Sequence, residues 1–554
     1  MLDRKILHRG ACALAALTSL AVSAGAQTNL YGKTGTAPYD RLGAVVRLAG
    51  DVNMDGRPDF VAGAPQNGNL FGPGPGYVRV YSGLNGSILH TFNGITDDDA
   101  FGAAVDGVGD VNNDGFADIV VGAPQLNNLT GRVYVKSGQN GANLFTFDGA
   151  AAGDQLGLCV AGIGDVNNDG RPDILAGTPL AAGGGTSRGM ARIYSGMNGS
   201  VLMTINGTAN NARFGVSADG IGDVNGDGRA DFIVGSYFQG AKIYSGQTFG
   251  VLQTFTGAGD DRLGFAVAGC GDANADGTPD VIVGAPQDNS VFAPGTGYAK
   301  VYSGSTGALI RTLTGGAPGD RFGCSVAGAR DIDGDSRAEL LVGADQDTIG
   351  GEGYARLYRG SDGVVLHTFD GLASGSRCGI SVDGLGDLEG NGSFELIVGA
   401  PNRSVPLTLT GRLDVWSVNA AGCPMPYTYC AVNNNSSGQP ALMSHTGTTS
   451  IAANNFALVT SGAPANTLGL FYYGANEMQA AFGNGFRCVG GTVWRLGIRP
   501  SNGSGVASFA IDFGAVPAPI TASSTWKFQY WYRNPAAGGA NFNLSNGLSA
   551  TFCN

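Results

Sequence analysis

Oxygen-bearing side chains recur in this sequence at a spacing that suits a metal ion. They occupy positions 1, 3, 5 and 9 of a nine-residue segment, with a glycine at position 6 and the backbone carbonyl of position 7 as a further donor. In the first copy these residues are Asp51, Asn53, Asp55, Gly56, Arg57 and Asp59. Hard cations such as calcium bind about six to eight oxygens from carboxylates, amides, carbonyls and water. The segment therefore predicts a calcium-binding loop.

The segment occurs seven times, and five copies retain every donor. The other four complete sets are Asp110, Asn112, Asp114, Phe116 and Asp118; Asp165, Asn167, Asp169, Arg171 and Asp173; Asp223, Asn225, Asp227, Arg229 and Asp231; and Asp272, Asn274, Asp276, Thr278 and Asp280. The sixth set, Asp331, Asp333, Asp335, Arg337 and Glu339, keeps the donors but has Ser336 at the glycine position. The seventh, Asp387, Glu389, Asn391 and Glu395, departs furthest, and its metal binding stays open.

The spacing at positions 1, 3 and 5 resembles the start of an EF-hand loop, in which a glycine permits the sharp turn. It differs because the closing acid stands at position 9 and a strand follows it. The seven loops hold 22 of the 44 Asp and Glu residues. Ordinary Asp-Gly turns do not require donors in register seven times. We therefore expect about five to seven Ca²⁺ ions and a loss of stability in chelator.

Short segments around each loop must position it. Successive copies begin 49 to 59 residues apart, and each contains four apolar runs, illustrated by 101–105, 119–124, 77–83 and 88–94. Such runs, rich in Val, Ile, Phe and Tyr and bounded by Gly, Asn and Asp, are typical of strands. A mainly helical fold is disfavoured because 95 of the 554 residues are Gly, which weakens helices. Four strands per copy predict an all-β fold with a seven-bladed β-propeller.

The two ends of the repeat region complement each other. The seventh copy stops after its third run at 411–416, and a segment like the missing fourth run lies at 29–35. We therefore expect the N-terminal strand to complete the last blade and close the ring. One position of the first run is always small, as a crowded axis requires: Val45, Ala104, Cys159, Ser217, Ala266, Ser325 and Ser381. Cys159, Cys270 and Cys324 are then expected to be small buried residues.

The combination of Phe-Gly, the acidic loop and Gly-Ala-Pro, as in Phe101-Gly102 and Gly122-Ala123-Pro124, resembles the FG-GAP repeat of the integrin α-chain propeller and its bacterial relatives. The resemblance covers residues 28–418 and implies a seven-bladed propeller with structural calcium and a role in adhesion or ligand binding. The departures from the pattern are Gly177-Thr178-Pro179, Gly235-Ser236-Tyr237 and Gly343-Ala344-Asp345 in place of Gly-Ala-Pro, and Arg377-Cys378-Gly379 in place of Phe-Gly.

The regions that flank the repeats have a different character. Residues 1–26 combine a basic start, a short apolar stretch and Ala24-Gly25-Ala26, which is typical of an export signal. We expect the propeller over 27–418, a linker over 419–422 and a small β-sandwich over 423–554, with alternating runs at 454–460, 468–473, 492–498, 505–513 and 526–533. The last region contains Cys423, Cys430, Cys488 and Cys553, so two disulfides are expected, with the pairing open.

The loops that follow Gly-Ala-Pro are expected on the face opposite the acidic loops. They vary in length and carry Phe71, Tyr237, Phe238 and Phe292. Variable loops on a rigid scaffold are usual binding elements, so these aromatic side chains are candidate ligand contacts or loop anchors. In the last region, Trp531 is a candidate for stacking on a sugar, with ordinary packing as the alternative.

Charge and composition exclude several classes of function. The net charge of −12 argues against a nucleic-acid partner, and no segment after the signal is long and apolar enough for a transmembrane helix. Only four His are present, and His90 and His367 fall near the ends of outer strands, so no catalytic residues are expected and the protein is not expected to be an enzyme. We expect a secreted, extracellular calcium-binding protein for adhesion or ligand binding, with an extracellular protein or glycan as partner. A secreted hydrolase of a propeller-containing family and a structural component associated with the cell envelope stay open as alternatives.

Overall fold

The computed structural model describes residues 27–66, 74–97, 99–182, 184–258, 261–288, 295–333, 335–390, 393–402, 409–418, 426–447, 449, 451, 454–521 and 524–552. Nearly all regular structure in these residues is β-strand. The exceptions there are a short turn of helix, α1 (Leu126–Leu129), and two 3-10 turns, η1 (Asp347–Ile349) and η2 (Pro535–Ala537). The expected all-β fold class is confirmed.

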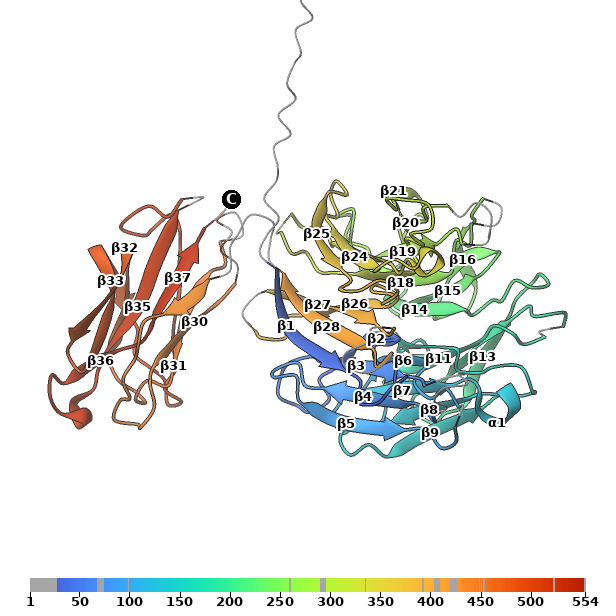
Figure 1. Ribbon diagram of the computed structural model, residues 1–554, viewed down its shortest axis with the longest axis horizontal. Helices are drawn as coiled ribbons and strands as arrows, with labels where there is room; N and C mark the ends of the chain where they lie inside the picture. The colour runs from blue at the N-terminus through green and yellow to red at the C-terminus, as the bar shows by residue number, and fades with distance from the viewer. Residues whose placement is uncertain are drawn as a thin grey trace, which may run out of the picture.

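The repeats form seven antiparallel sheets of four strands each (Figure 1). In six of them the strands follow chain order from the innermost outward. These are β2 (Val45–Gly50), β3 (Asp59–Ala64), β4 (Tyr77–Tyr81) and β5 (Ile88–Asn93); β6 (Ala104–Gly109), β7 (Asp118–Ala123), β8 (Arg132–Lys136) and β9 (Asn143–Asp148); β10 (Cys159–Gly164), β11 (Asp173–Thr178), β12 (Met190–Tyr194) and β13 (Val201–Asn206); β14 (Ser217–Gly222), β15 (Asp231–Ser236), β16 (Gly240–Tyr244) and β17 (Val251–Phe255); β18 (Ala266–Gly271), β19 (Asp280–Ala285), β20 (Tyr298–Tyr302) and β21 (Leu309–Thr314); and β22 (Ser325–Gly328), β23 (Leu340–Ala344), β24 (Tyr354–Tyr358) and β25 (Val365–Asp370).

The seventh sheet joins the two ends of the repeat region. Its order is β26 (Val382–Gly386), β27 (Phe394–Ala400), β28 (Arg412–Val418) and then β1 (Gln27–Thr34). Strand β1 pairs antiparallel with β28, from Gln27 opposite Val418 to Thr34 opposite Arg412. Each innermost strand contacts the innermost strand of the next sheet, and β26 contacts β2. The prediction that the N-terminal strand completes the last blade and closes the ring is confirmed.

Close contacts between glycines join neighbouring blades. A Cβ atom added to Gly63, in the Gly-Ala-Pro segment of the first blade, would lie 2.1 Å from the carbonyl oxygen of Gly102, the Phe-Gly glycine of the next blade. Gly102 adopts φ +86° and donates its N–H to the carbonyl of Gly122 in its own blade at 2.9 Å. The same contact recurs at every interface, including Gly399 against Gly43, where the last blade meets the first. Only glycine lets the two backbones approach this closely.

The channel along the propeller axis is lined by small residues, as expected. The seven small residues of the innermost strands all border one cavity of about 330 Å³. Cys159, Cys270 and Cys324 are buried and unpaired, which confirms the prediction made for them. Cys159 and Cys324 border the axial cavity, whereas Cys270 packs in an apolar core cluster.

Three carboxylates and one guanidinium lie in the middle of the channel, around a cavity of about 250 Å³. Asp106 accepts the N–H of Gly162 at 2.9 Å, Asp219 that of Gly269 at 2.8 Å and Asp383 that of Leu48 at 2.8 Å, so that each carboxylate bonds to the next blade. Arg47 donates to the carbonyl of Val46 at 3.0 Å. Burial raises the pKa of Asp106 to about 8 and that of Asp219 to about 7, although the positive charge of Arg47 opposes the change.

The strands after the propeller form two packed sheets. One has the order β29 (Tyr427–Tyr429), β37 (Gly547–Thr551), β35 (Thr525–Arg533), β32 (Gly469–Phe482) and β33 (Gly485–Ile498), with β36 (Phe542–Leu544) paired to β35. The other consists of β30 (Leu442–Thr446), β31 (Ala457–Ser461) and β34 (Ala507–Ala510). Phe471, Phe528 and Tyr530 from the first sheet and Leu458 from the second share one buried core. This arrangement is the β-sandwich that the alternating runs predict.

One of the two expected disulfides lies within the described residues. Cys430 and Cys488 are bonded, with their Cα atoms 5.9 Å apart and 58 residues between them in sequence. Two of the three possible pairings are therefore excluded. Cys423 and Cys553, the remaining two cysteines of this region, lie outside the described residues.

The glycine contact predicts a large effect from a very small substitution. Gly63→Ala places a methyl group against the carbonyl oxygen of Gly102, so we expect the free energy of unfolding to fall by about 1–3 kcal/mol. Gly503→Ala is the matched control, because a Cβ atom there meets nothing within 4 Å. Chemical denaturation of both variants is the measurement. Equal stability of the two variants would contradict the packing argument.

The channel carboxylates predict a pH dependence of stability. Their pKa values are higher in the folded chain than the ordinary value of about 4 for an aspartate, so the folded state binds protons that the unfolded state releases. Stability contributed by Asp106 is therefore present below about pH 4 and is lost as the pH rises towards about 8. We expect Asp106→Asn to stabilise the protein at pH 8 and to flatten the change between pH 5 and pH 8. Urea unfolding at several pH values in saturating calcium tests this, with the outer-strand variant Asp148→Asn as control; an unchanged slope in Asp106→Asn would refute it.

Candidate metal sites

The seven acidic segments are the hairpin loops between the innermost and second strands of each sheet. We number them by blade as loop one to loop seven, residues 51–59, 110–118, 165–173, 223–231, 272–280, 331–339 and 387–395. All seven join corresponding strands of the ring, so they lie on one face of the propeller. The loops lie in separate blades, and among the described residues loop six alone is a group of three or more acidic side chains whose oxygens all lie within 4.8 Å of one another.

Side-chain oxygens hold the backbone of each loop in one shape. In loop one, Asp51 accepts the N–H groups of Asp55 at 3.2 Å and Gly56 at 2.9 Å. Asn53 accepts the N–H of Asp55 at 2.9 Å, and Asp55 accepts that of Arg57 at 2.9 Å. Loops two, three, four and six repeat all four bonds, and loop five repeats three of them. Positions 1, 3 and 5 are therefore oriented before any ion binds.

Position 6 needs a left-handed backbone conformation in every complete loop. Gly56 has φ +81°, and the corresponding glycines of loops two to five have similar values. Ser336, which replaces glycine in loop six, adopts the same conformation with φ 67°. A residue with a Cβ atom is less stable there, so loop six keeps the shape at a cost in stability.

The acid at position 9 connects its loop to a second hairpin. Asp59 is fully buried at the start of β3. One carboxylate oxygen accepts the N–H of Val52 in the loop at 2.8 Å, and the other accepts the N–H of Gly83 between β4 and β5 at 2.9 Å. Loops two to five repeat both bonds. Burial raises the pKa of Asp59 to about 6, so this carboxylate has a structural role as well as the predicted metal role.

Loop six is the densest acidic cluster in the described part of the chain. Oxygens of Asp331, Asp333, Asp335 and Glu339 lie within 4.8 Å of one another. Glu339 accepts the N–H of Ile332 at 2.5 Å through one oxygen, and its other oxygen is buried without a hydrogen-bond partner. Burial raises the pKa of Glu339 to about 9. A cation held by this cluster would supply the missing partner, so these residues fit a metal ion.

Loop five, like loop six, contains a buried oxygen atom without a hydrogen-bond partner. The amide nitrogen of Asn274, at position 3, donates to Asp276 at 2.9 Å and to Asp280 at 3.3 Å. Its amide oxygen is buried and accepts no hydrogen bond. Amide oxygens are common calcium ligands, so loop five also fits the predicted ion.

Loop six has one more acidic residue than loops one to five, and an arginine nearby compensates its charge. Ser195 and Ser245, which follow the third strands of their blades, donate to the position 5 acids Asp169 at 3.1 Å and Asp227 at 3.3 Å. Arg359 replaces this serine in blade six, and its Nε lies 2.7 Å from the Oδ2 of Asp333. Asp333 is the residue that is Asn in the five complete loops. The additional carboxylate is therefore paired with an additional guanidinium.

Loop seven is only partly described, because Asn391 lies outside the described residues. Glu395 accepts the N–H of Leu388 at 2.7 Å and the hydroxyl of Ser417 at 2.7 Å. It therefore keeps the connecting role of position 9. The metal binding of loop seven stays a prediction.

Position 7 has a role that the sequence pattern did not reveal. Its backbone carbonyl was the expected donor, but several of its side chains reach the loop of the preceding blade. Arg229 donates to the carbonyl of Val166 in loop three at 3.2 Å, and Arg337 donates to that of Ala273 in loop five at 3.4 Å. These contacts link neighbouring acidic loops with positive charge, and no spacing within one repeat indicates them.

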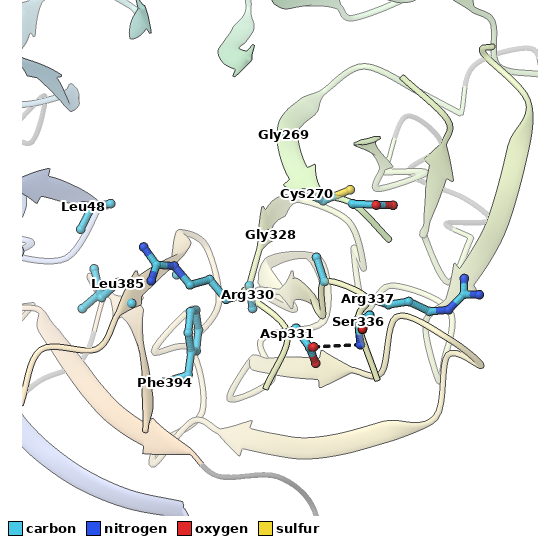
Figure 2. A pocket seen from close by; sticks show the side chains of 16 residues that line it. Leu48, Gly269, Cys270, Gly328, Arg330, Asp331, Ser336, Arg337, Leu385 and Phe394 are labelled. Carbon is cyan, nitrogen blue, oxygen red and sulfur yellow. Dashed lines mark hydrogen bonds between the residues drawn. The ribbon is translucent and has the colours of Figure 1, made fainter. Parts of the chain in front are cut away.

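A cavity of about 460 Å³ opens beside loops five and six (Figure 2). Arg330 reaches over it towards Leu385, and Phe394 lies below (Figure 2). The backbone N–H of Ser336 donates to Asp331 at 2.8 Å at its border. Arg330 occupies the place of the glycine that precedes each other acidic loop, for example Gly50 and Gly109.

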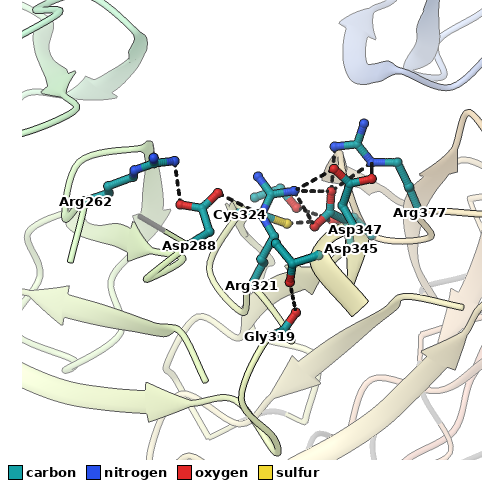
Figure 3. A network of polar contacts seen from close by, with 11 residues as sticks. Arg262, Asp288, Gly319, Arg321, Cys324, Asp345, Asp347 and Arg377 are labelled. Carbon is teal, nitrogen blue, oxygen red and sulfur yellow. Dashed lines mark hydrogen bonds and ion pairs between the residues drawn. The ribbon is translucent and has the colours of Figure 1, made fainter. Parts of the chain in front are cut away.

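Ion pairs connect the blades on the opposite face (Figure 3). Arg321 bonds to Asp288 at 2.9 Å and to the buried Asp345 at 2.9 Å, and Arg377 bonds to Asp345 at 2.7 Å. Arg262 extends the chain of pairs to Asp288 at 2.6 Å. Asp345 is the residue that replaces the proline of Gly-Ala-Pro, and its two arginine partners explain why this departure is tolerated. The two guanidinium groups compensate the charge of the buried carboxylate, which would be costly if it were left unpaired.

An aromatic group lies on the same face beside these pairs. The guanidinium groups of Arg213 and Arg262 lie 5.1 Å and 4.9 Å from the centre of the Tyr237 ring. The neighbouring Phe238 has 43 % of its surface exposed. Of the four predicted aromatic contacts, Phe238 is therefore exposed and Tyr237 is half-buried, whereas Phe71 and Phe292 lie outside the described residues.

The three described histidines have structural surroundings. His90 lies 2.6 Å from the carbonyl oxygen of Gly138, and His367 is buried. His445 stacks on Phe456 with ring centres 5.4 Å apart, and burial lowers its pKa to about 4. Among the described residues, no helix is long and apolar enough to cross a bilayer.

Comparison with known proteins identifies the repeats. Residues 48–81 and 101–135 match the family model of the FG-GAP repeat, and residues 165–234 match that of the FG-GAP-like repeat. The chain is 34% identical to bovine phosphatidylinositol-glycan-specific phospholipase D over 194 residues, which is 31% of this chain and 23% of that protein. It is 31% identical to integrin alpha-5 of Xenopus laevis over 207 residues, 34% of this chain and 19% of that one. Integrin alpha-8 of Gallus gallus is 32% identical over 235 residues, 38% of this chain and 22% of that one.

The chain thus spans about a fifth of the length of the curated relatives that it matches. The matched segments include the acidic loops of the first four blades and most of the strands around them. Sequence, sheet order and family models agree that the chain contains FG-GAP repeats, and these repeats are similar to those of integrin α-chains.

Proposed function

We propose that the protein is a secreted, calcium-stabilised propeller that binds an extracellular protein or glycan and serves in adhesion, and that it is not an enzyme. In this proposal residues 1–26 are an export signal, 27–418 the propeller, 419–422 a linker and 423–554 a separate domain. The observation that carries it is the repetition of one oxygen-rich loop on a closed ring of FG-GAP sheets.

The loop residues support calcium as the bound ion. The side chains at positions 1, 3, 5 and 9 and the carbonyl of position 7 would hold it in loops one to six. Bound calcium would supply the positive charge that offsets at least three carboxylates in each of these loops. The partnerless oxygens of Asn274 and Glu339 support this assignment, because a buried acceptor without a partner is costly.

The opposite face supports ligand binding. Phe238 is exposed, and Tyr237 and the nearby arginines provide an aromatic and cationic surface. Arg262, which contacts Tyr237, is itself paired with Asp288, and Asp288 is paired with Arg321, so ion pairs hold this part of the surface. Rigid support of an exposed aromatic contact is typical of protein-binding sites.

If the loops bind calcium, removing two ligands of one loop should change the melting temperature differently in calcium and in chelator. We expect Asp51→Asn combined with Asp55→Asn to lower the melting temperature in calcium, because one ion is lost. A site contributes about 2.7 kcal/mol when free calcium is ~100-fold above Kd. In chelator the same variant should melt at the same or a higher temperature, since two repelling carboxylates are gone. Asp148→Asn, on an outer strand, is the control.

Titration calorimetry on the stripped mature chain, residues 27–554, counts the ions. We expect about five to seven sites in the parent and one fewer in the loop-one variant. Equal melting of the parent chain in calcium and in chelator would refute calcium stabilisation.

The ligand face predicts a selective loss of binding. We expect immobilised cell-envelope material to capture the mature chain in calcium, and Phe238→Ala to weaken capture at least about tenfold, as an exposed aromatic contact can contribute more than 1 kcal/mol. Ile88→Ala, which trims an exposed outer strand, should bind like the parent. Equal capture of Phe238→Ala and the parent would contradict this assignment.

Two further measurements separate the alternatives. Turnover of a chromogenic phosphodiester would favour the hydrolase that the phospholipase D similarity raises. Loss of cell-envelope retention only when residues 419–554 are removed would favour a structural envelope component anchored by that region.

A further inference from the structure

A cavity of about 520 Å³ lies in the C-terminal sandwich, on the face of the larger sheet that points away from the shared core. Along β35 the side chains of Phe528, Tyr530 and Tyr532 belong to that core. Trp531 lies between them in sequence and therefore on the other face, where it packs against a second, smaller apolar cluster with Leu470 and Phe542. A sheet that buries one face needs no half-buried tryptophan on the other, so this cluster calls for a separate explanation.

Three aromatic rings form a continuous wall of the cavity. The ring centres of Trp531 and Phe542 are 5.6 Å apart, and those of Phe542 and Phe482 are 5.4 Å apart. Phe482, at the end of β32, has 48 % of its surface exposed. Flat aromatic faces that are partly open to solvent offer a surface for the C–H face of a sugar ring, which is apolar on that side only.

Two arginines complete the cavity. Arg487 and Arg495, both on β33, line it together with the aromatic wall. Among the described residues, Arg487 is held through its Nε, which donates to the carbonyl of Val489 at 2.8 Å, and Arg495 forms no ion pair. A guanidinium binds a carboxylate or sulfate with two parallel hydrogen bonds. The cavity therefore combines a surface for a sugar ring with two groups that suit an anionic substituent.

The charge of the whole region agrees with an anionic ligand. Residues 423–554 contain one Asp and one Glu but one Lys and four Arg, in a protein of net charge −12. Glu477 is already paired with Lys527 at 2.7 Å. The four arginines of this region therefore have almost no acidic residue within the same region to pair with, which is unusual in a chain of negative net charge.

We propose that this cavity binds an acidic polysaccharide, with Trp531 and Phe542 stacking on the sugar rings and Arg487 and Arg495 binding the anionic groups. The site is separate from the acidic loops and from the ligand face of the propeller, so it does not rest on the proposed function. The anionic groups are carboxylates or sulfates, and the two are distinguished by experiment.

The test measures affinity of the mature chain for four soluble polymers by titration calorimetry. Polygalacturonate supplies carboxylates, dextran sulfate supplies sulfates, and fully methyl-esterified polygalacturonate and dextran are their neutral counterparts. We expect binding of at least one acidic polymer, in calcium and in chelator, and at least tenfold weaker binding of the neutral ones. Equal affinity for acidic and neutral polymers, or no binding of either acidic polymer, would overturn the proposal.

Matched variants locate the site. Arg495→Gln and Trp531→Ala should each weaken binding of the acidic polymer at least tenfold. Arg499→Ala removes the same charge from the same region, but its guanidinium lies 4.8 Å from the Phe509 ring and does not line the cavity, so its affinity should stay within twofold of the parent. If Trp531→Ala does not fold, Trp531→Leu and the fluorescence change of the parent on titration replace it. An equal loss in Arg499→Ala and Arg495→Gln would show non-specific attraction and refute the site.

Discussion

The close approach of two glycines at each interface between blades is the constraint on which the ring depends. Gly63 meets the carbonyl of Gly102, and Gly399 meets that of Gly43, with no room for a Cβ atom at either place. Because the contact recurs at all seven interfaces, it fixes how far each blade stands from the next. The Phe-Gly and Gly-Ala-Pro motifs are therefore two halves of one interface, contributed by neighbouring blades.

Buried carboxylates then align the hairpins on that frame. Asp59 joins its acidic loop to the hairpin between β4 and β5, and Asp383 joins the last blade to the first at Leu48. Such groups need hydrogen-bond donors once buried, and backbone N–H groups supply them here. The acid at position 9 thus anchors one end of each acidic loop to the strands, and the side chains of positions 1, 3 and 5 bond to the loop backbone at the other end. The buried acid of each loop is therefore hydrogen-bonded, and the remaining acids of the loop lie outside the core.

Much of this architecture follows from patterns within one repeat. The short apolar runs, the loop spacing and the unfinished seventh copy together predicted the sheets and the pairing of β1 with β28. What the sequence did not predict depends on contacts between repeats. Asp345 departs from the Gly-Ala-Pro pattern, and the pattern gives no reason for the departure. In the structure its partners are Arg321 and Arg377, which lie 24 and 32 residues away in sequence. The bond between Cys430 and Cys488 and the crossing of Arg229 to loop three are of the same kind. Periodicity carries no information about such pairs, because each is made once or between different units.

The pairing of β1 with β28 also constrains the order of events when the chain is made. Asn29 bonds to Asp414, a residue 385 positions later, so the first strand to emerge is the last to find its partner. Blades one to six can each form from neighbouring residues, whereas closure waits for the end of the repeat region. Until then β1 and the exposed edge that it will cover are both unpaired, and unpaired edges promote association between chains. During synthesis an early strand of this chain must therefore stay free of other partners until the ring can close.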